Sequence, residues 1–364
     1  MTSYESVRQM IEVVPTATSA TVRDIKWVTD AHVVGVSRDP NGHIEVFIAG
    51  SKIIPVSASV RDAMEFRVVH RDGQPSFDAN RIALPALPHF DQVAAFICTE
   101  LLQNGADTSL MDAFEKTEPI IELAIERLHL SNQVMVGLVG ELLLLDALCR
   151  RATDTQVAQI VRSWDGWKRS SRDFCLGTTG VEVKTTTENT SSHIIEGVHQ
   201  VERDTVSRDG QPEDRLLLVS IGVQTGTREH NAISIPALVD RIIDRMRGAG
   251  SEDVVVGQFL SRLAEYGSDS GSGYVHGTQE SDPAYSRGFL TTFFRAYDMT
   301  DGAIQVLRRQ DVTVRAHVDV RSVKFRIDLP TAVSAGNPIV GANQVADAIL
   351  QARAQRNRIG PPIT

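Results

Sequence analysis

Two carboxylates and one lysine lie close together in the segment Ser171–Lys184. They are Asp173, Glu182 and Lys184, and a single valine separates the last two. Paired carboxylates suit a hard cation such as Mg²⁺, which takes one or two of them and completes its shell with water and phosphate oxygens. A lysine beside that cation adds a fixed positive charge that accepts no hydrogen bond. The three residues therefore predict a site that acts on phosphate esters.

The chain between Asp173 and Lys184 has the pattern of a β-hairpin. Gly177 and Gly180 flank the turn, and glycine readily adopts the positive φ angles that tight turns need. A symmetric turn places Asp173 opposite Lys184 and puts Asp173 and Glu182 on a diagonal of roughly 7–8 Å. Because side chains alternate across a strand, the two acids and the lysine share one face. The other face is apolar and consists of Phe174, Leu176, Val181 and Val183.

Such a site has the parts needed to hydrolyse a phosphodiester bond. The metal would polarise the scissile phosphate and lower the pKa of a bound water. Lys184 would orient or deprotonate that water, or stabilise the charge that develops in the transition state. Alternatively, the same residues form a solvent-facing hairpin with an ordinary ion pair, an interaction worth about 0–1 kcal/mol.

Asp173 and the segment Gly180–Lys184 resemble the Asp…Glu-x-Lys core of the PD-(D/E)XK nuclease superfamily. The chain resembles more closely a bacterial family of PD-(D/E)XK motif proteins, which are often found in phage-defence and restriction gene clusters. This resemblance is strongest between residues 130 and 225. It departs from the superfamily pattern in one respect, because no proline precedes Asp173. The residues that carry it are Gly140–Leu145, Trp164–Trp167, Arg172–Phe174 and Val181–Thr186.

Glu141 is a further acidic candidate. It lies in the apolar segment Leu138–Leu145, which we expect to be helical and buried. Burying an unpaired carboxylate is costly, so a buried glutamate needs a reason. Gly137 and Gly140 lie on one side of this helix and would let it approach a sheet closely. In the superfamily, the helix before the core often supplies a glutamate to the site; the alternative is a solvated or salt-bridged helix position.

The resemblance implies a metal-dependent endonuclease that hydrolyses DNA, the nuclease subunit of a bacterial restriction or anti-phage defence system. It implies Mg²⁺ as cofactor, with Mn²⁺ as substitute, held by Asp173, Glu182 and Glu141, and these residues with Lys184 as the catalytic set. It also implies partner proteins such as an ATPase and a methyltransferase. The chain has no helicase or methyltransferase motif of its own, so energy use and self-protection would lie elsewhere. A homodimer is a further possibility. The alternative function is a non-catalytic DNA-binding or assembly module of such a complex.

The surrounding sequence predicts the elements that position these residues. We expect a β-rich domain over residues 1–86, an α/β domain with a restriction-endonuclease-like core over 87–335, and a C-terminal helix and tail over 336–364. That core is a mixed sheet flanked by helices. Strands are predicted at Ile44–Ile48, Phe66–His70, Asp173–Leu176, Val181–Thr185, His193–Val198, Leu216–Gly222, Val312–Val318 and Val323–Leu329; helices are predicted at Phe90–Leu102, Met111–Leu128, Val134–Arg151, Ile235–Arg247 and Asp253–Tyr266.

Four polar residues near the hairpin are weaker candidates. His193 could reach the site from a neighbouring strand, and Thr185, Thr186 and Gln200 could contact DNA phosphate. The alternative for each is an ordinary polar residue whose hydrogen bonds are made within the protein or with water, and this is the more frequent case. Trp164 and Trp167 are expected to be packing anchors.

Net charge, cysteine content and the length of apolar segments exclude several classes of protein. The net charge of −9 is unfavourable for tight, unassisted binding to DNA, which needs a basic surface. Three cysteines without a Cys-x-x-Cys motif form neither a disulfide framework nor a structural zinc site, and they fit the reducing cytoplasm. No segment reaches the roughly 20 predominantly apolar residues of a spanning helix, so we expect no membrane association.

Overall fold

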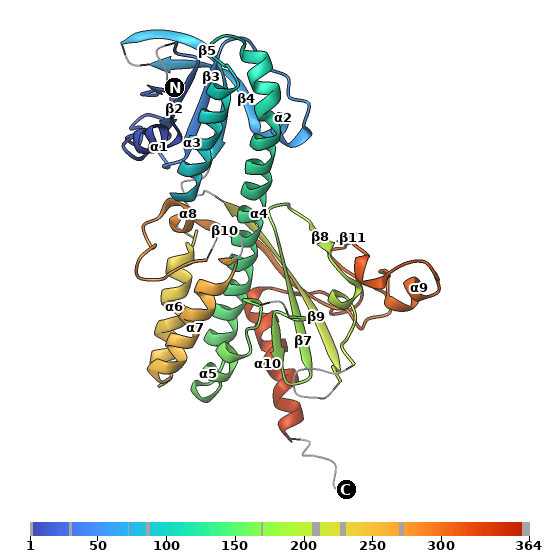
Figure 1. The fold of residues 1–364 in the computed structure, drawn as a ribbon. Helices are drawn as coiled ribbons and strands as arrows, with labels where there is room; N and C mark the ends of the chain where they lie inside the picture. The colour runs from blue at the N-terminus through green and yellow to red at the C-terminus, as the bar shows by residue number, and fades with distance from the viewer. Residues whose placement is uncertain are drawn as a thin grey trace. The chain divides into compact units, whose positions relative to one another are not determined.

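The structure is a computed structural model that describes residues 3–28, 31–71, 73–84, 88–168, 170–205, 212–225, 231–268 and 273–358. The chain forms two compact units: residues 1–132 with residues 281–284, and residues 133–280 with residues 285–364 (Figure 1). The division falls within helix α4 (Leu110–Arg151), whose last turns belong to the second unit. In the described part of the chain, no helix combines the length and the apolar character needed to cross a membrane.

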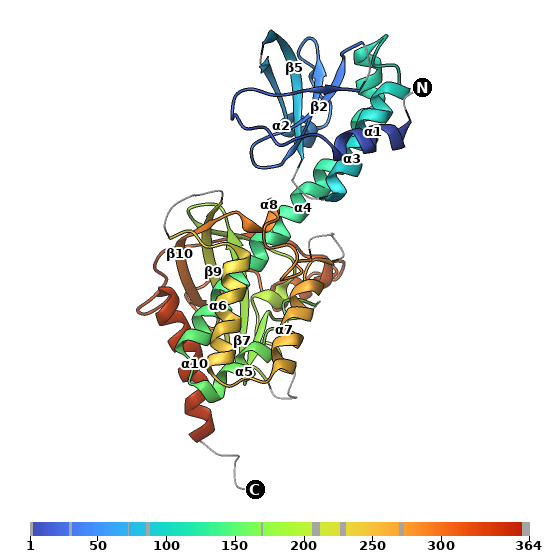
Figure 2. The ribbon, with the colours of Figure 1, turned by 90° about the vertical axis from the view of Figure 1, so that its left-hand side faces the viewer.

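The first unit contains a five-stranded antiparallel sheet in the order β1-β2-β3-β5-β4 (Figure 2). Helix α3 contacts β2 and β3 and also packs against α1. Because α3 completes this unit, the unit extends past residue 86, where the sequence predicts the end of the β-rich domain. The bounds are α1 Tyr4–Glu12, β1 Lys26–Trp27, β2 Val34–Arg38, β3 Ile44–Ala49, α2 Ala58–Ala63, β4 Met64–Arg71, β5 Gln74–Leu84 and α3 Pro88–Gln103.

The second unit is built on a mixed sheet in the order β12-β10-β9-β7-β6. Strands β7 and β9 are parallel, and the other neighbours are antiparallel. A two-stranded sheet of β8 and β11 packs over one face, with an apolar cluster between the two sheets. The bounds are β6 Phe174–Leu176, β7 Thr179–Thr186, β8 Ser191–Ile195, β9 Arg215–Thr225, β10 Phe289–Asp298, β11 Phe325–Leu329 and β12 Ile339–Val340. This arrangement confirms the predicted mixed sheet flanked by helices.

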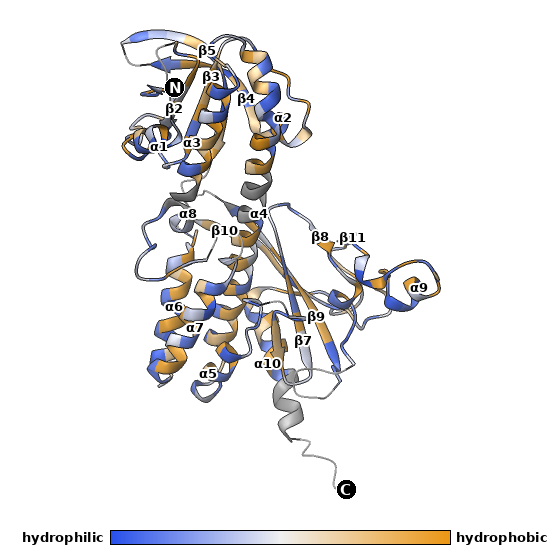
Figure 3. Cartoon of the chain, viewed as in Figure 1, coloured by the Kyte–Doolittle hydropathy of each residue, from blue (hydrophilic) through white to orange (hydrophobic). Residues whose placement is uncertain are grey.

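Helices cover the other face of this sheet, where Figure 2 shows α5, α6 and α7 in front of β7 and β9. Buried residues of α6 recur at helical spacing, and Figure 3 shows the corresponding alternation of hydrophobic and hydrophilic bands on α6 and α7. The apolar band of each helix therefore faces the sheet. The remaining bounds are α5 Asp154–Arg162, α6 Ile235–Gly248, α7 Asp253–Glu265, α8 Pro283–Ser286, α9 Arg309–Thr313 and α10 Ala342–Arg358, with single 3₁₀ turns at Val198–Gln200 and Val320–Ser322.

Three sequence predictions of secondary structure are wrong. The two helices predicted at Met111–Leu128 and Val134–Arg151 are one helix, α4. The polar residues Ser131 and Asn132, which separate the two predicted helices, lie inside α4, because polar residues cost a helix interior well under about 1 kcal/mol each. The strand predicted at Val312–Val318 is replaced in part by α9.

Local hydrogen bonds explain why two of the predicted strands are replaced or shortened. The Asp311 carboxylate accepts a hydrogen bond from the Arg308 backbone N–H and so caps the start of α9. The strand predicted at His193–Val198 ends at Ile195, where the Gln200 side chain accepts from the Glu196 N–H and the chain enters a 3₁₀ turn. Strand β10, which lies between β12 and β9 in the sheet, was not predicted.

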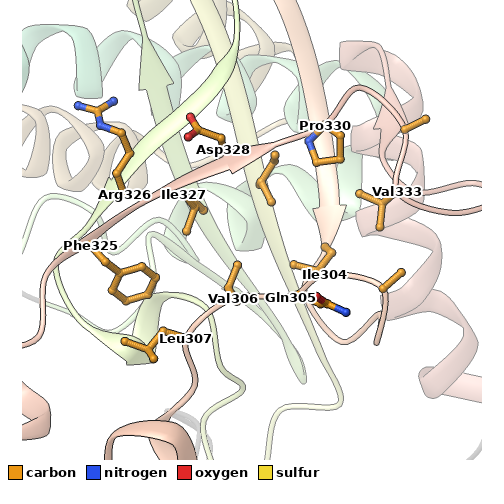
Figure 4. Close-up of a pocket in the computed structure, with 13 residues that line it drawn as sticks. Ile304, Gln305, Val306, Leu307, Phe325, Arg326, Ile327, Asp328, Pro330 and Val333 are labelled. Atoms are coloured by element: carbon orange, nitrogen blue, oxygen red, sulfur yellow. The ribbon is translucent and has the colours of Figure 1, made fainter.

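A pocket of about 390 Å³ lies beside β11, between that strand and the segment 303–307 (Figure 4). Most of the residues that line it are of apolar type, with Ile304, Val306 and Phe325 among those drawn. None of the four predicted catalytic residues lines it. The chemistry predicted from the sequence therefore belongs to a different part of the second unit.

Candidate active site

The predicted hairpin is present, but its register differs by two residues from the predicted one. Phe174 of β6 lies opposite Val181 of β7 instead of Val183. The turn is centred on Gly177 and Thr178, and Gly177 adopts a φ of +66°. A shift by two residues leaves every side chain on its predicted face, because the period of a strand is two. The predicted core residues are accordingly buried: Phe174, Leu176, Val181 and Val183.

Asp173 ends the ladder between β6 and β7. Its backbone N–H donates to the Val181 carbonyl at 3.1 Å, and its carboxylate Oδ2 accepts from the Val183 N–H at 2.7 Å. The carboxylate thus takes the place that a further strand residue would have occupied. The last paired residues of the hairpin are Phe174 and Val181. One residue beyond this pair, Asp173 is level with Glu182, whereas the predicted register placed the two acids on a diagonal.

Glu182 and Lys184 lie on the face of β7 that is turned toward β8. The Lys184 Nζ is 3.1 Å from Glu182 Oε1, and the exposed fractions of the two side chains are 18% and 6%. In the neighbouring strand β9, Leu218 lies beside Glu182 and Ser220 beside Lys184. The ion pair therefore sits where the apolar core between the sheets gives way to polar residues, and it is not the solvent-facing pair of the alternative interpretation.

Glu141 reaches the same place from the last turns of α4. It is buried, and its two carboxylate oxygens accept hydrogen bonds from Trp164 Nε1 at 2.6 Å and from the Tyr266 hydroxyl at 2.8 Å. Gly140 packs on Thr185 of β7, and a side chain at either Gly140 or Gly166 would overlap its neighbour. At Gly166 that neighbour is the Glu141 carboxylate itself, so the glycine makes room for the acid.

The three carboxylates interact electrostatically. Burial raises the pKa of Asp173 well above its ordinary value, and the negative charges of Glu141 and Glu182 raise it further. Burial also raises the pKa of Glu141 to about 7, although the hydrogen bonds from Trp164 and Tyr266 oppose this shift. Lys184 lowers both pKa values and cannot balance three acids alone. A cation at this position would relieve the repulsion.

The donor set suits a hard divalent cation of the Mg²⁺ type. Within the described ranges, no group of three or more histidine, cysteine, aspartate or glutamate side chains is arranged to hold a metal ion. Asp173 and Glu182 nevertheless provide adjacent carboxylates, and Mg²⁺ needs only one or two when water and substrate oxygens complete its shell. Glu141 has both oxygens engaged by protein donors, so its predicted role as a third ligand stays a prediction.

Sequence reasoning missed the residues that hold these acids in place. Tyr266 follows α7 and stacks on Trp164, with ring centroids 6.1 Å apart. Both rings donate to Glu141, so Trp164 is more than the predicted packing anchor. The indole N–H of a buried tryptophan usually needs a hydrogen-bond acceptor. This need was the one feature of the sequence that could have linked Trp164 to a polar residue. Nothing local in the sequence links Tyr266 to Glu141.

A buried ion pair supports the residue before Asp173. Arg172 contacts the Glu213 carboxylate through Nε at 3.0 Å and Nη2 at 2.8 Å, and both side chains are almost fully buried. Arg172 also donates to the carbonyls of His199 and Glu202. The pair lies over Gly180, where a Cβ would overlap it. Arg172 thus anchors the start of the hairpin to the segment that follows β8.

The weaker candidates have different positions. His193 comes from β8, and its Nε2 is 2.7 Å from Ser220 Oγ; burial, with Lys184 nearby, lowers its pKa to about 4. Thr186 is buried, and its hydroxyl accepts from the Glu188 N–H. Thr185 lies against α4, and Gln200 bonds to the backbone of its own turn. Of the four, His193 is therefore the residue next to the predicted site.

The β6–β7 hairpin of the mixed sheet thus carries two acids, Asp173 and Glu182, and a lysine two residues after the second acid. The chain matches, over residues 22–283, the family described as "Putative PD-(D/E)XK family member, (DUF4420)". Because this match covers well over half of the chain, the chain belongs to that family, which is nuclease-like. No curated protein matches the chain. No solved structure matches it either.

Proposed function

We propose that the protein is a metal-dependent endonuclease that hydrolyses DNA phosphodiester bonds. One observation carries the proposal: β7, the end of β6 and helix α4 bring Glu182, Lys184, Asp173 and Glu141 to one buried place. Buried like charges that raise one another's pKa are costly for folding, and such arrangements cluster at functional sites. Membership of a nuclease-like family supports the same assignment.

Each residue has a role that follows from its surroundings. Asp173 and Glu182 would hold Mg²⁺, with Mn²⁺ as a substitute, and that cation would polarise the scissile phosphate and acidify a water. Lys184, kept near the acids by Glu182, would orient the water and stabilise negative charge on the phosphate. Glu141, held by Trp164 and Tyr266, would complete the negative side of the site and accept a proton near neutral pH.

We further propose that the chain acts as the nuclease subunit of a bacterial restriction or anti-phage system in the cytoplasm. An ATPase, a methyltransferase or a second copy would then present the DNA. The charge supports the need for such partners, since a net charge of −9 repels a polyanion. Several arginines of the second unit are also engaged by acids and so add little to a basic surface: Arg150 and Arg241 with Asp146, Arg151 with Asp347, and Arg245 with Asp154.

A plasmid-nicking assay tests the proposal. The purified chain should nick supercoiled DNA slowly in Mg²⁺ or Mn²⁺, and more weakly as salt rises. Lys184→Ala and Asp173→Asn should abolish nicking while the far-UV circular dichroism spectrum stays native. Lys324→Ala, which removes an exposed lysine paired with Glu196, is the matched control and should nick at the wild-type rate.

The alternative, a non-catalytic DNA-binding or assembly module, is distinguished by the same assay. It predicts no metal-dependent nicking by the wild-type chain, alone or with its partners, and equal DNA binding by wild type and Asp173→Asn. Wild-type turnover in Lys184→Ala would contradict the assigned site, and it would also exclude the non-catalytic alternative.

A further inference from the structure

Lys184 begins a row of side chains that crosses the central sheet. The register places Lys184 of β7 beside Ser220 of β9, and Ser220 beside Arg295 of β10. Directly paired residues point to the same face of a sheet, so Arg295 shares the face of Lys184. His193 of the overlying β8 contacts Ser220 in the middle of this row. A basic side chain therefore stands at each end, with neutral polar groups between them.

Contacts with its neighbours orient the half-buried Arg295 guanidinium. Its Nη1 donates to Ser191 Oγ at 3.1 Å, and its central carbon lies 4.4 Å from the centroid of the Phe293 ring. The Phe293 ring in turn lies over Gly222, where a Cβ would overlap it. Stacking on an aromatic ring holds the guanidinium plane while its remaining N–H groups stay available to a planar or anionic acceptor.

Among the described residues, the Arg295 guanidinium has a hydroxyl contact, with Ser191, and no ion pair. By contrast, Arg215, at the other end of the β9–β10 pair, is bonded to Asp298 at 2.8 Å. An ordered guanidinium without an acid, on the face that carries Lys184, is suited to an anionic group of the substrate.

We propose that Arg295 binds a backbone phosphate of the nucleic acid strand being cut, a few nucleotides from the scissile phosphate. This inference rests on the proposed function of the site. Neighbouring strands are about 4.8 Å apart, so the backbones at Lys184 and Arg295 are separated by roughly 10 Å. A duplex strand carries one phosphate per about 3.4 Å of its axis and winds around that axis, so consecutive phosphates are farther apart than this rise and the distance spans at most about three nucleotides. Arg295 thus sets the register of the substrate strand relative to Lys184.

Cleavage of duplex oligonucleotides that carry one neutral methylphosphonate tests this inference. The substitution is moved along the cut strand, one position at a time, to about five nucleotides on each side of the mapped cut. For the wild-type chain in Mg²⁺, one position about one to three nucleotides from the cut should raise KM about tenfold, as expected for the loss of one charge-assisted hydrogen bond. Arg295→Met should raise KM about tenfold on the unmodified duplex and should be insensitive to methylphosphonate at that position.

Arg326→Met is the matched control. Arg326 also donates to a serine of β8, Ser192 Oγ at 3.1 Å, but Figure 4 shows its side chain pointing away from the pocket side of β11, where Ile327 and Phe325 lie. This variant should keep the wild-type pattern of sensitivity. If Arg295→Met still loses activity at the sensitive position, or if no position is sensitive, the assignment of Arg295 is wrong while the nuclease proposal stands. Failure of the wild-type chain to cut any duplex overturns both.

Discussion

Replacing Glu141 by glutamine should stabilise the metal-free protein at alkaline pH. Glu141 is buried beside Asp173 and Glu182, and its ionised form has lost its hydration. A glutamine fits the same contacts, because its Oε1 can accept from Trp164 Nε1 and its amide can donate to the Tyr266 oxygen, whose hydroxyl hydrogen can rotate away. The substitution therefore removes the buried charge and keeps one hydrogen bond each to Trp164 and Tyr266.

The size of the effect follows from the pKa of Glu141. Its ordinary value is 4.5, and burial raises it to about 7 in the folded protein. Between these values the folded state holds a proton that the unfolded state has released, so stability present below pH 4.5 is lost as the pH rises through 7. The full loss is about 3 kcal/mol, at 1.36 kcal/mol per pKa unit. Glutamine has no proton to release and escapes this loss.

The assay is urea unfolding of both proteins in a metal chelator at pH 5 and pH 8. The free energy of unfolding of Glu141→Gln relative to wild type should increase by about 2–3 kcal/mol between the two pH values. Glu115→Gln, at an exposed position of the same helix, is the control and should show no such increase. An advantage of glutamine that is equal at both pH values would refute the reasoning, because the cost would then not come from ionisation.

Three further predictions concern packing and metal binding. Phe174→Ala should lower the free energy of unfolding by about 3–5 kcal/mol in urea titrations, because the ring is fully buried, whereas Ala at the exposed Phe96 should cost less than about 1 kcal/mol. Gly166→Ala should reduce nicking at least about tenfold, since its methyl group must displace the Glu141 carboxylate, and a wild-type rate would show that this placement does not matter. Millimolar Mg²⁺ at pH 8 should raise the wild-type Tm in thermal scans by a few degrees, and Asp173→Asn should lose the shift; an equal shift in both proteins would exclude Asp173 as a ligand.

Local sequence was sufficient for the two faces of the hairpin. Alternation along β6 and β7 placed Phe174 and Val183 in the core, and Asp173, Glu182 and Lys184 on the other side, although the predicted register was off by two residues. The turn chemistry did not decide between a turn at Gly177–Thr178 and a longer one. An even shift preserves the faces, so the prediction of the acidic face survived the error.

Helix positions were predictable for the same reason. The amphipathic repeat of α6 is a property of adjacent turns, and it identifies the buried side of the helix without knowledge of the partner. Two predictions of helix bounds and type failed. Helix α4 continues through Ser131 and Asn132. The chain at Val312 enters a short helix because Asp311 caps its start by a local hydrogen bond, which the alternating pattern did not indicate.

The amino-acid sequence by itself determined which residues could do chemistry and which side of each element they occupy, because alternation and helical repeats act over a few residues. Only the tertiary structure decided what surrounds them. Glu141 meets Trp164 and Tyr266, and Lys184 is aligned with Arg295, across many intervening residues. Such contacts depend on how helices and strands pack in space, and the raised pKa values of Asp173 and Glu141 arise from the burial and the like charges that this packing creates.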